Sequence, residues 1–363
     1  MDRRSFVLGL TGAGMAASAL AGFGEGAFAQ VETTEAAAAD AILSRVDPEL
    51  REGARRILDR PLPAWTAESL AALRAFPPMN QAPSSSSVAV ERRTAPGRRG
   101  QPDVGFELIG AKPRPPALRP AIVHIHGGGF ILGRVSDTTA MCQELAAEFD
   151  CVVANVDYRL APETRFPGPM EDCYAVLAWV HANADALGVD PARVAIMGES
   201  AGGGLAAMTA IASRDRGDTP LCYQVLVYPM LDDRTGSTVR VPPFIGTIGW
   251  NEAGNRFGWS CLLGLEAGSA AILYGAAPAR LESVAGLAPA FIGVGGLDLF
   301  VDEDIVYARR LIEAGVPVRL HVTPGAYHGF DFIAPQARAS REFTAAWKSE
   351  LKAAFAAPAV ESG

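Results

Sequence analysis

Lysine is scarce in this chain of 363 residues, which has only Lys112, Lys348 and Lys352 among its 32 basic residues. The net charge is −8 at pH 7, and no helix-like segment is dense in lysine and arginine. Proteins that bind nucleic acid ordinarily present such a basic face to the phosphates. The charge pattern therefore argues against nucleic acid as a partner and favours a neutral or apolar substrate.

Cysteine is also sparse, with five residues and no Cys-x-x-Cys pair. The odd number leaves at least one cysteine outside any internal disulfide, and we expect most of them to be buried thiols. The pair His124-x-His126 has no carboxylate or thiol cluster nearby that would complete a tetrahedral site. The sequence therefore predicts no metal site, and no cofactor is implied.

No long uninterrupted apolar run is present, even at the N-terminus, where Arg3-Arg4 precedes a Gly/Ala-rich stretch ending in an Ala-x-Ala site at Ala29. This arrangement is typical of a twin-arginine export signal, and the glycines in it disfavour a membrane span. We expect residues 1–29 to be a signal peptide and the protein to be periplasmic or secreted. It would be cytoplasmic if the signal is not used, and no stable membrane insertion is expected after cleavage.

Short apolar runs alternate with helix-like segments from residue 121 onward. Such alternation predicts a mostly parallel sheet with helices on both faces. A basic segment with Pro and Gly at 92–119 predicts a solvated hairpin. The expected strands lie near 121–125, 151–156, 194–197, 224–228, 291–294 and 318–322, and the expected helices near 137–149, 168–186, 201–214, 302–314 and 340–355.

Two segments stand outside this alternation. Residues 30–87 combine two or three short helix-like stretches with a linker rich in Pro and Ser. Residues 231–288 are too long for a simple connection, and we expect them to form helices. We expect both segments to cap the carboxyl edge of the sheet, whereas 88–230 and 289–363 form the core.

Ser200 lies in the pattern Gly-Glu-Ser-Ala-Gly at 198–202, which is typical of a strand that turns sharply into a helix. Residues larger than glycine at Gly198 or Gly202 are expected to collide with neighbouring backbone. The pattern alone is weak evidence in a chain with 38 glycines. A second motif, His126-Gly127-Gly128-Gly129-Phe130, strengthens it because the two together describe a nucleophile and a backbone cradle for the charge it generates.

The expected cradle consists of backbone N–H groups that stabilise an oxyanion. We expect the donors to be Gly128, Gly129 and Ala201, and we expect the motifs to be supported by His126, Gly127, Gly198 and Gly202. A phosphate-binding turn is a poor alternative because the chain contains no Gly-Lys pair for a P-loop.

A serine nucleophile needs a base, and the base needs an acid that orients it. Among five histidines, His328 is favoured because it lies in a turn-rich loop after the last expected strand. Packing or local hydrogen bonding explains the other four more simply. Asp298 is favoured as the acid because it follows the apolar run 291–294 through two glycines.

Other acidic and serine residues compete for these roles. Asp302, Glu303 and Asp304 begin an expected helix, where carboxylates oppose the positive end of the helix dipole. Ser349 and Lys352 fit a Ser-x-x-Lys motif, but a charged C-terminal helix explains them better. The favoured order is therefore serine, aspartate, histidine, which is the order of an α/β-hydrolase.

These motifs resemble the hormone-sensitive lipase family, the bacterial family IV carboxylesterases of the α/β-hydrolase superfamily. The resemblance implies an α/β-hydrolase fold, with a mostly parallel central sheet of about eight strands beneath a helical cap. Glu199 replaces the Asp or Thr of many members, and no proline follows Asp298. The matching segments are 126–130, 156–163, 198–203, 298–303 and 327–330.

The resemblance implies hydrolysis of short- and medium-chain carboxylic esters. The sequence thus predicts a serine carboxylesterase with Ser200, Asp298 and His328 as its catalytic residues. One alternative is a related hydrolase of acetylated sugars, amides or carbamates. The other is a ligand-binding receptor on the same fold, which the presence of His328 disfavours. The expected partner is a small-molecule ester, and a homodimer is left open.

Overall fold

The computed structural model describes residues 39–60, 63–75, 88–98, 100–111 and 117–357. Residues 45–363 form one compact unit, and of the other unit, residues 1–44, only 39–44 are described. The expected signal peptide lies outside the described residues, as does the Pro/Ser-rich stretch at 76–87. None of the described helices is long and apolar enough to cross a membrane.

Among the described residues, eight strands form a single sheet in the order β1-β2-β4-β3-β5-β6-β7-β8. Strands β1 and β2 pair antiparallel, as do β2 and β4, and all other neighbours are parallel. The predicted mostly parallel sheet is confirmed. The predicted hairpin is also present, but only its first strand is solvated, because the strand Val104–Ile109 is almost wholly buried. The strands are β1 (Val90–Ala95), β2 (Val104–Ile109), β3 (Arg119–Ile125), β4 (Val152–Val156), β5 (Val189–Glu199), β6 (Tyr223–Val227), β7 (Ala290–Gly295) and β8 (Val318–Thr323).

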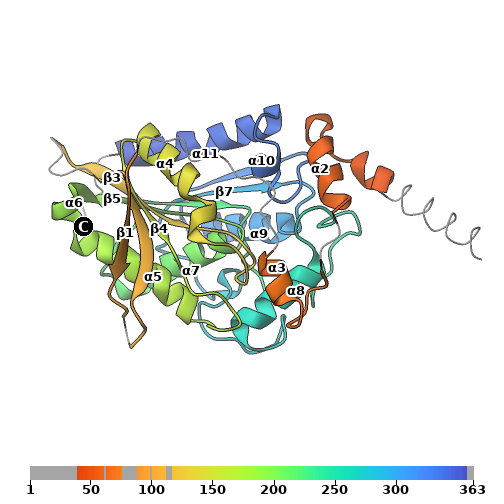
Figure 1. Cartoon of the computed structure of the whole chain (residues 1–363), viewed down its shortest axis with the longest axis horizontal. Helices are drawn as coiled ribbons and strands as arrows, with labels where there is room; N and C mark the ends of the chain where they lie inside the picture. Colours follow the sequence, from red (N-terminus) through yellow and green to blue (C-terminus); the bar gives the residue numbers. More distant parts are fainter. Residues whose placement is uncertain (1–38, 61–62, 76–87, 99, 112–116, 358–363) are drawn as a thin grey trace, which may run out of the picture. The chain divides into compact units, whose positions relative to one another are not determined.

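Helices cover both faces of the sheet, as the near-continuous apolar character of β3, β4, β6 and β7 requires. Figure 1 shows α4 and α11 along one face and α5 and α7 along the other. The helices and 3₁₀ turns are η1 (Pro48–Leu50), α2 (Arg51–Leu58), α3 (Leu70–Ala75), η2 (Val135–Asp137), α4 (Thr139–Glu148), α5 (Gly168–Ala182), α6 (Ala184–Leu187), α7 (Ala201–Arg216), α8 (Glu252–Leu263), η3 (Pro278–Arg280), α9 (Val301–Glu313), α10 (Phe330–Ile333) and α11 (Arg338–Ala356).

The short helices expected in the N-terminal segment are present as η1, α2 and α3. Helix α3 is tied to the core through Arg74, whose guanidinium donates to Ile131 O and Ala161 O, both at 2.9 Å. The same side chain forms a two-pronged ion pair with Glu163, at 2.7 and 2.8 Å. One arginine therefore holds this helix against the loops that follow β3 and β4.

The segment 231–288 differs from the helices expected for it, because α8 is its only α-helix and η3 a single 3₁₀ turn. Prolines 242 and 243 and several glycines interrupt the rest of the segment. The fully buried carboxylate of Asp233 connects distant parts of this segment instead. Asp233 accepts a hydrogen bond from Gly268 N at 2.9 Å and pairs with Arg280 at 3.0 Å.

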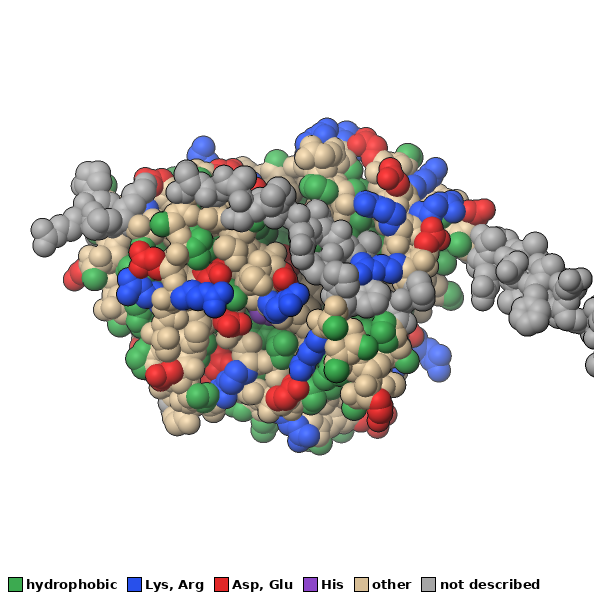
Figure 2. All heavy atoms as spheres, in the orientation of Figure 1, with side chains coloured by type: hydrophobic (Ala, Val, Ile, Leu, Met, Phe, Trp, Pro, Cys, Tyr) green, Lys and Arg blue, Asp and Glu red, His purple; other side chains and the backbone are tan. Residues whose placement is uncertain are grey.

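The surface carries basic and acidic side chains side by side, and Figure 2 shows them interspersed on one face. Many of them pair, including Arg338 with Glu342 at 2.8 Å and Lys348 with Glu148 at 2.6 Å. Exposed pairs of this kind contribute little to stability individually. The free energy of folding therefore depends mainly on the buried layers and on close backbone packing within them.

Replacing Gly202 with alanine tests that packing. A Cβ atom at residue 202 would overlap the carbonyl groups of Ile125 and His126, which belong to backbone and cannot rotate away. We expect Gly202→Ala to lower the free energy of unfolding by about 3 kcal/mol, measured by urea denaturation. Gly105→Ala is the matched control, because the atom nearest its Cβ would lie 3.8 Å away. Equal losses for the two variants would contradict the packing argument.

Candidate active site

Ser200, His328 and Asp298 form one hydrogen-bonded line. Ser200 Oγ lies 2.9 Å from His328 Nε2, and His328 Nδ1 lies 2.8 Å from Asp298 Oδ2. The three residues come from the turns that follow β5, β8 and β7. Because the carboxyl ends of parallel strands meet at one edge of a sheet, residues 128 positions apart reach one another there.

The surroundings of Asp298 determine where the imidazole protons lie. Its carboxylate is fully buried and also accepts a hydrogen bond from Phe300 N at 3.0 Å. A carboxylate accepts, so Nδ1 of His328 carries a proton and Nε2 is free to accept one from Ser200 Oγ. The rings of Phe300 and Tyr228 lie edge-on to His328, with centroids 5.2 and 4.8 Å from it. The imidazole of His328 is thus held in one tautomer and one orientation.

The turn at Ser200 is strained, with φ of 56° and ψ of −123°. Its N–H donates to Val227 O at 2.9 Å, and its carbonyl accepts from Met230 N at 3.0 Å. A Cβ at Gly198 would overlap the carbonyl of Gly202, and one at Gly202 would overlap that of Ile125. The predicted collision with neighbouring backbone is confirmed, and it explains why both positions are glycine.

The glycine loop after β3 lies directly against this turn, since a Cβ at Gly127 would be 3.3 Å from that of Ser200. Gly128 and Gly129 have φ of 127° and 60°, a region that glycine adopts readily. Within the part of the chain that the structure describes, the N–H groups of Gly128, Gly129 and Ala201 donate no hydrogen bond. The three predicted donors are therefore available to a ligand.

His126 supports this loop. Its Nδ1–H donates to Gly127 O at 2.8 Å, and its ring stacks on Tyr158 with centroids 4.3 Å apart. Tyr158 in turn donates from its hydroxyl to His126 O at 3.0 Å. His124, two residues earlier, contacts a different set of groups, and no cluster of three or more potential metal ligands occurs among the described residues.

The competing carboxylates lie at the start of α9, as the dipole argument predicted. Glu303 accepts hydrogen bonds from Leu231 N at 2.7 Å and Asp232 N at 3.0 Å, so it anchors the start of the inserted segment. Burial raises the pKa of Asp304 well above its ordinary value. Asp298 is the carboxylate that the structure brings to His328.

Sequence reasoning missed Tyr228 and the contact that Gly249 of the expected cap makes with His328. The hydroxyl of Tyr228 donates to Asp331 Oδ1 at 3.0 Å while its ring flanks His328. A Cβ at Gly249 would lie 2.7 Å from His328 O, and one at Gly129 would overlap the ring of Trp250. A lone tyrosine at a strand end and a glycine in an irregular segment carry no distinctive sequence signal.

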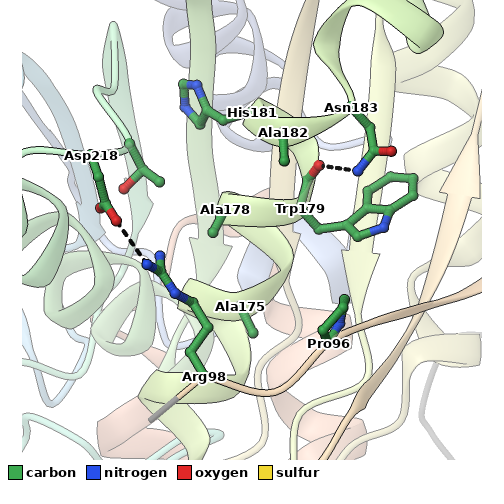
Figure 3. Close-up of a pocket in the computed structure, with 10 residues that line it drawn as sticks. Pro96, Arg98, Ala175, Ala178, Trp179, His181, Ala182, Asn183 and Asp218 are labelled. Atoms are coloured by element: carbon green, nitrogen blue, oxygen red, sulfur yellow. Dashed lines mark hydrogen bonds and ion pairs between the residues drawn. The ribbon is translucent and has the colours of Figure 1, made fainter.

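Two cavities elsewhere contain none of the predicted site residues. One, of about 640 Å³, lies along α5 and is bounded by the ion pair between Arg98 and Asp218 (Figure 3). The other, of about 460 Å³, lies between Met170 and Leu273. Neither combines a nucleophile, a base and free backbone donors, so we place the candidate site at Ser200.

Comparison with known proteins gives a consistent result. A family model for the alpha/beta hydrolase fold matches residues 122–332. The chain is 34% identical over 273 residues to the carboxylesterase NlhH of Mycobacterium tuberculosis, covering 73% of this chain and 83% of that protein. Among solved structures, a bacterial heroin esterase has a TM-score of 0.76 and 35% identity, covering 87% of this chain and 99% of that one. The esterase LipW of Mycobacterium marinum has a TM-score of 0.73 and 33% identity, covering 87% and 98%.

The buried ring of His126 predicts a loss of stability in acid. Burial lowers its pKa from 6.5 to about 4, so between these values the unfolded chain binds a proton that the native state does not. The contribution of this group to stability is complete above pH 6.5 and falls by about 3 kcal/mol as the pH drops through 4. His126→Phe keeps an aromatic ring beside Tyr158 but has no group that binds this proton. We expect its free energy of unfolding, measured by urea denaturation, to fall by about 3 kcal/mol less between pH 7 and 4 than that of the native protein. Parallel pH curves for the two proteins would contradict this assignment.

Proposed function

The chain belongs to the α/β-hydrolase fold family, and from this premise we propose that it is a serine carboxylesterase acting through an acyl-enzyme on Ser200. The observation that carries the proposal is the hydrogen-bonded line from Ser200 through His328 to Asp298, beside free backbone donors. The esterase names of its relatives agree with this chemistry.

The proposed reaction has two halves. His328 Nε2 takes the hydroxyl proton as Ser200 Oγ attacks the ester carbonyl, and the buried Asp298 stabilises the imidazolium that forms. When the tetrahedral intermediate collapses, His328 passes the proton to the leaving alcohol and the acyl group remains on Ser200. His328 then deprotonates a water that attacks the acyl-enzyme. As the second tetrahedral intermediate collapses, the imidazolium returns this proton to Ser200 Oγ and the carboxylic acid is released.

The glycine loop stabilises the charge that both tetrahedral intermediates carry. Backbone N–H groups of Gly128, Gly129 and Ala201 are already oriented by the turn, so no reorganisation is needed during reaction. Each such donor is typically worth about 3 to 4 kcal/mol of transition-state stabilisation. Together with the activated serine, these donors favour chemistry at an acyl carbon.

We propose short- and medium-chain esters as the substrates. The covering segment supports this choice, because Gly249 packs on His328 and the ring of Trp250 packs on Gly129 close to the reacting atoms. Trp250 is itself held by Asn255, to which its indole N–H donates at 3.2 Å, and by Trp65, at 5.0 Å between centroids. Because these contacts hold Trp250 in place beside Gly129, we expect it to limit the length of the acyl chain.

A panel of p-nitrophenyl esters from acetate to palmitate tests the proposal, beside an amide, a carbamate and an acetylated sugar. We expect the highest kcat/KM at short chain lengths, with Ser200→Ala reducing it by about a millionfold. Ser349→Ala is the control, since this exposed serine lies on α11 and should leave the rate unchanged. Turnover of only the amide, carbamate or sugar would favour the alternative hydrolase, and activity that survives in Ser200→Ala would refute the nucleophile.

We propose export through the twin-arginine signal at residues 1–29, on the evidence of Arg3-Arg4 and the Ala-x-Ala site at Ala29. The five cysteines are all free thiols, which suits a protein that folds in a reducing cytosol before transport. The homodimer left open by the sequence stays a prediction.

Replacing both arginines of the signal by lysine should abolish export while leaving the mature protein unchanged. We expect the native chain to appear in the periplasmic fraction or medium at a mass shortened by the signal, and Arg3→Lys/Arg4→Lys to remain cytoplasmic at full length. Fractionation with esterase assay and mass spectrometry measures both. Export of the double variant at the same level would contradict the twin-arginine assignment.

A further inference from the structure

A row of polar side chains crosses four neighbouring strands of the sheet and ends beside the nucleophile. Glu107 on β2 pairs in register with Asn155 on β4, which pairs with His124 on β3. On β5, the register partner of His124 is Met197. Glu199, the last residue of β5, lies two positions further along the strand, so its side chain is on the same face of the sheet as that of His124. His124 and Asn155 are completely buried. The row therefore lies inside the protein, where each polar group needs a partner.

The amide of Asn155 determines the proton on one nitrogen of His124. Its Nδ2 donates to Glu107 Oε2 at 3.2 Å and to Val135 O at 3.0 Å. Its Oδ1 therefore faces His124 Nδ1, at 2.9 Å, and can only accept. Nδ1 of His124 consequently carries a proton.

Glu199 determines the proton on the other nitrogen. Both of its carboxylate oxygens lie near His124 Nε2, at 3.0 and 3.1 Å, and an ionised carboxylate only accepts. A ring whose two nitrogens both donate is an imidazolium. Burial opposes this charge, whereas Cys142 and Glu199 beside the ring raise the pKa of His124, and the net pKa lies well above its ordinary value.

We propose that His124 is an imidazolium that forms a buried ion pair with Glu199 and thereby acts as a positioning residue for Ser200, a role that rests on the proposed esterase function. Glu199 is joined to the nucleophile by one peptide bond, and its backbone carbonyl lies against the glycine loop, at 2.9 Å from where a Cβ of Gly127 would be. Because His124 on β3 holds the side chain of Glu199, the end of β5 stays in place where the chain turns into α7.

The pair also keeps the surroundings of the nucleophile neutral. An imidazolium and a carboxylate together carry no net charge, so Glu199 does not repel the oxyanion that forms after attack. Without the positive ring, a carboxylate adjacent in sequence to Ser200 would oppose that negative charge in a medium that screens it poorly. His124 therefore acts through Glu199 and does not itself contact the substrate.

Three variants separate this charge effect from ordinary packing. His124→Gln can still donate a hydrogen bond to Glu199 but has no positive charge, and Glu199→Gln removes the negative charge at nearly constant shape. We expect His124→Gln to lower kcat on p-nitrophenyl acetate by about 10- to 100-fold with KM changed less than about threefold, since the unpaired charge acts on the transition state. Glu199→Gln should lose less.

The double variant is the decisive comparison. Because it contains neither charge, His124→Gln/Glu199→Gln should recover most of the rate that His124→Gln loses. A histidine that serves only to fill space would make the double variant at least as slow as the slower single variant, and that result would overturn the proposal. Unchanged kcat in His124→Gln would overturn it as well. Thermal unfolding of each variant verifies that the compared proteins are folded.

A measurement on the unaltered chain does not depend on activity or on the folding of His124→Gln. In ¹⁵N-labelled protein at pH 7.5, we expect one histidine whose two ring nitrogens both carry protons, and Glu199→Gln should shift that signal. A neutral ring at His124 would overturn the ion pair. If the native protein hydrolysed no ester, the proposed function and the positioning role would fail, while this spectrum would still test the ion pair by itself.

Discussion

The close approach of backbone segments around Ser200 is the constraint on which the rest of the site depends. Strand β5 must turn into α7 within one residue, and the φ of 56° at Ser200 is tolerated because glycines on both sides admit neighbouring carbonyls. The turn is also hydrogen-bonded to Val227 and Met230, so the end of β6 holds it from the other side. The strained backbone at Ser200 is therefore held in place by the central strands of the sheet.

Two carboxylates beside this turn, the buried Asp298 and the partly buried Glu199, have specific partners. Asp298 accepts from His328 and from Phe300 N, and Glu199 accepts from His124. Burial of a charge is costly unless it is paired, so each of these groups stabilises one geometry and disfavours others. These polar contacts thus fix the orientation of the site residues, whereas the stability of the fold comes mainly from apolar packing.

The segments that cover the site follow a different principle. Individual side chains attach them to the core: Arg74 on α3 binds the loop after β3, and Glu303 binds the start of the inserted segment. Within that segment, the ion pair between Asp233 and Arg280 connects parts of the chain that are not joined by helical hydrogen bonds.

The sheet, its flanking helices and the three residues joined at the site were predictable from sequence, because each depends on a local signal. Alternating apolar runs specify strands and helices, and glycines at 127–129, 198 and 202 mark where backbone must approach backbone. The partners of Glu199 and Tyr228 were not predictable. They lie 75 and 103 residues away, and no spacing along the chain relates them.

The sequence by itself therefore determined that Ser200, Asp298 and His328 meet, since turn residues at strand ends place these groups at one edge of a parallel sheet. Tertiary structure alone decided the buried row from Glu107 to Glu199, the contact of Tyr228 with His328, and the irregular path of residues 231–288. Each of these depends on side chains that meet only after strands distant in sequence have paired. The physical reason is that register between strands, and not order along the chain, sets which polar groups face one another.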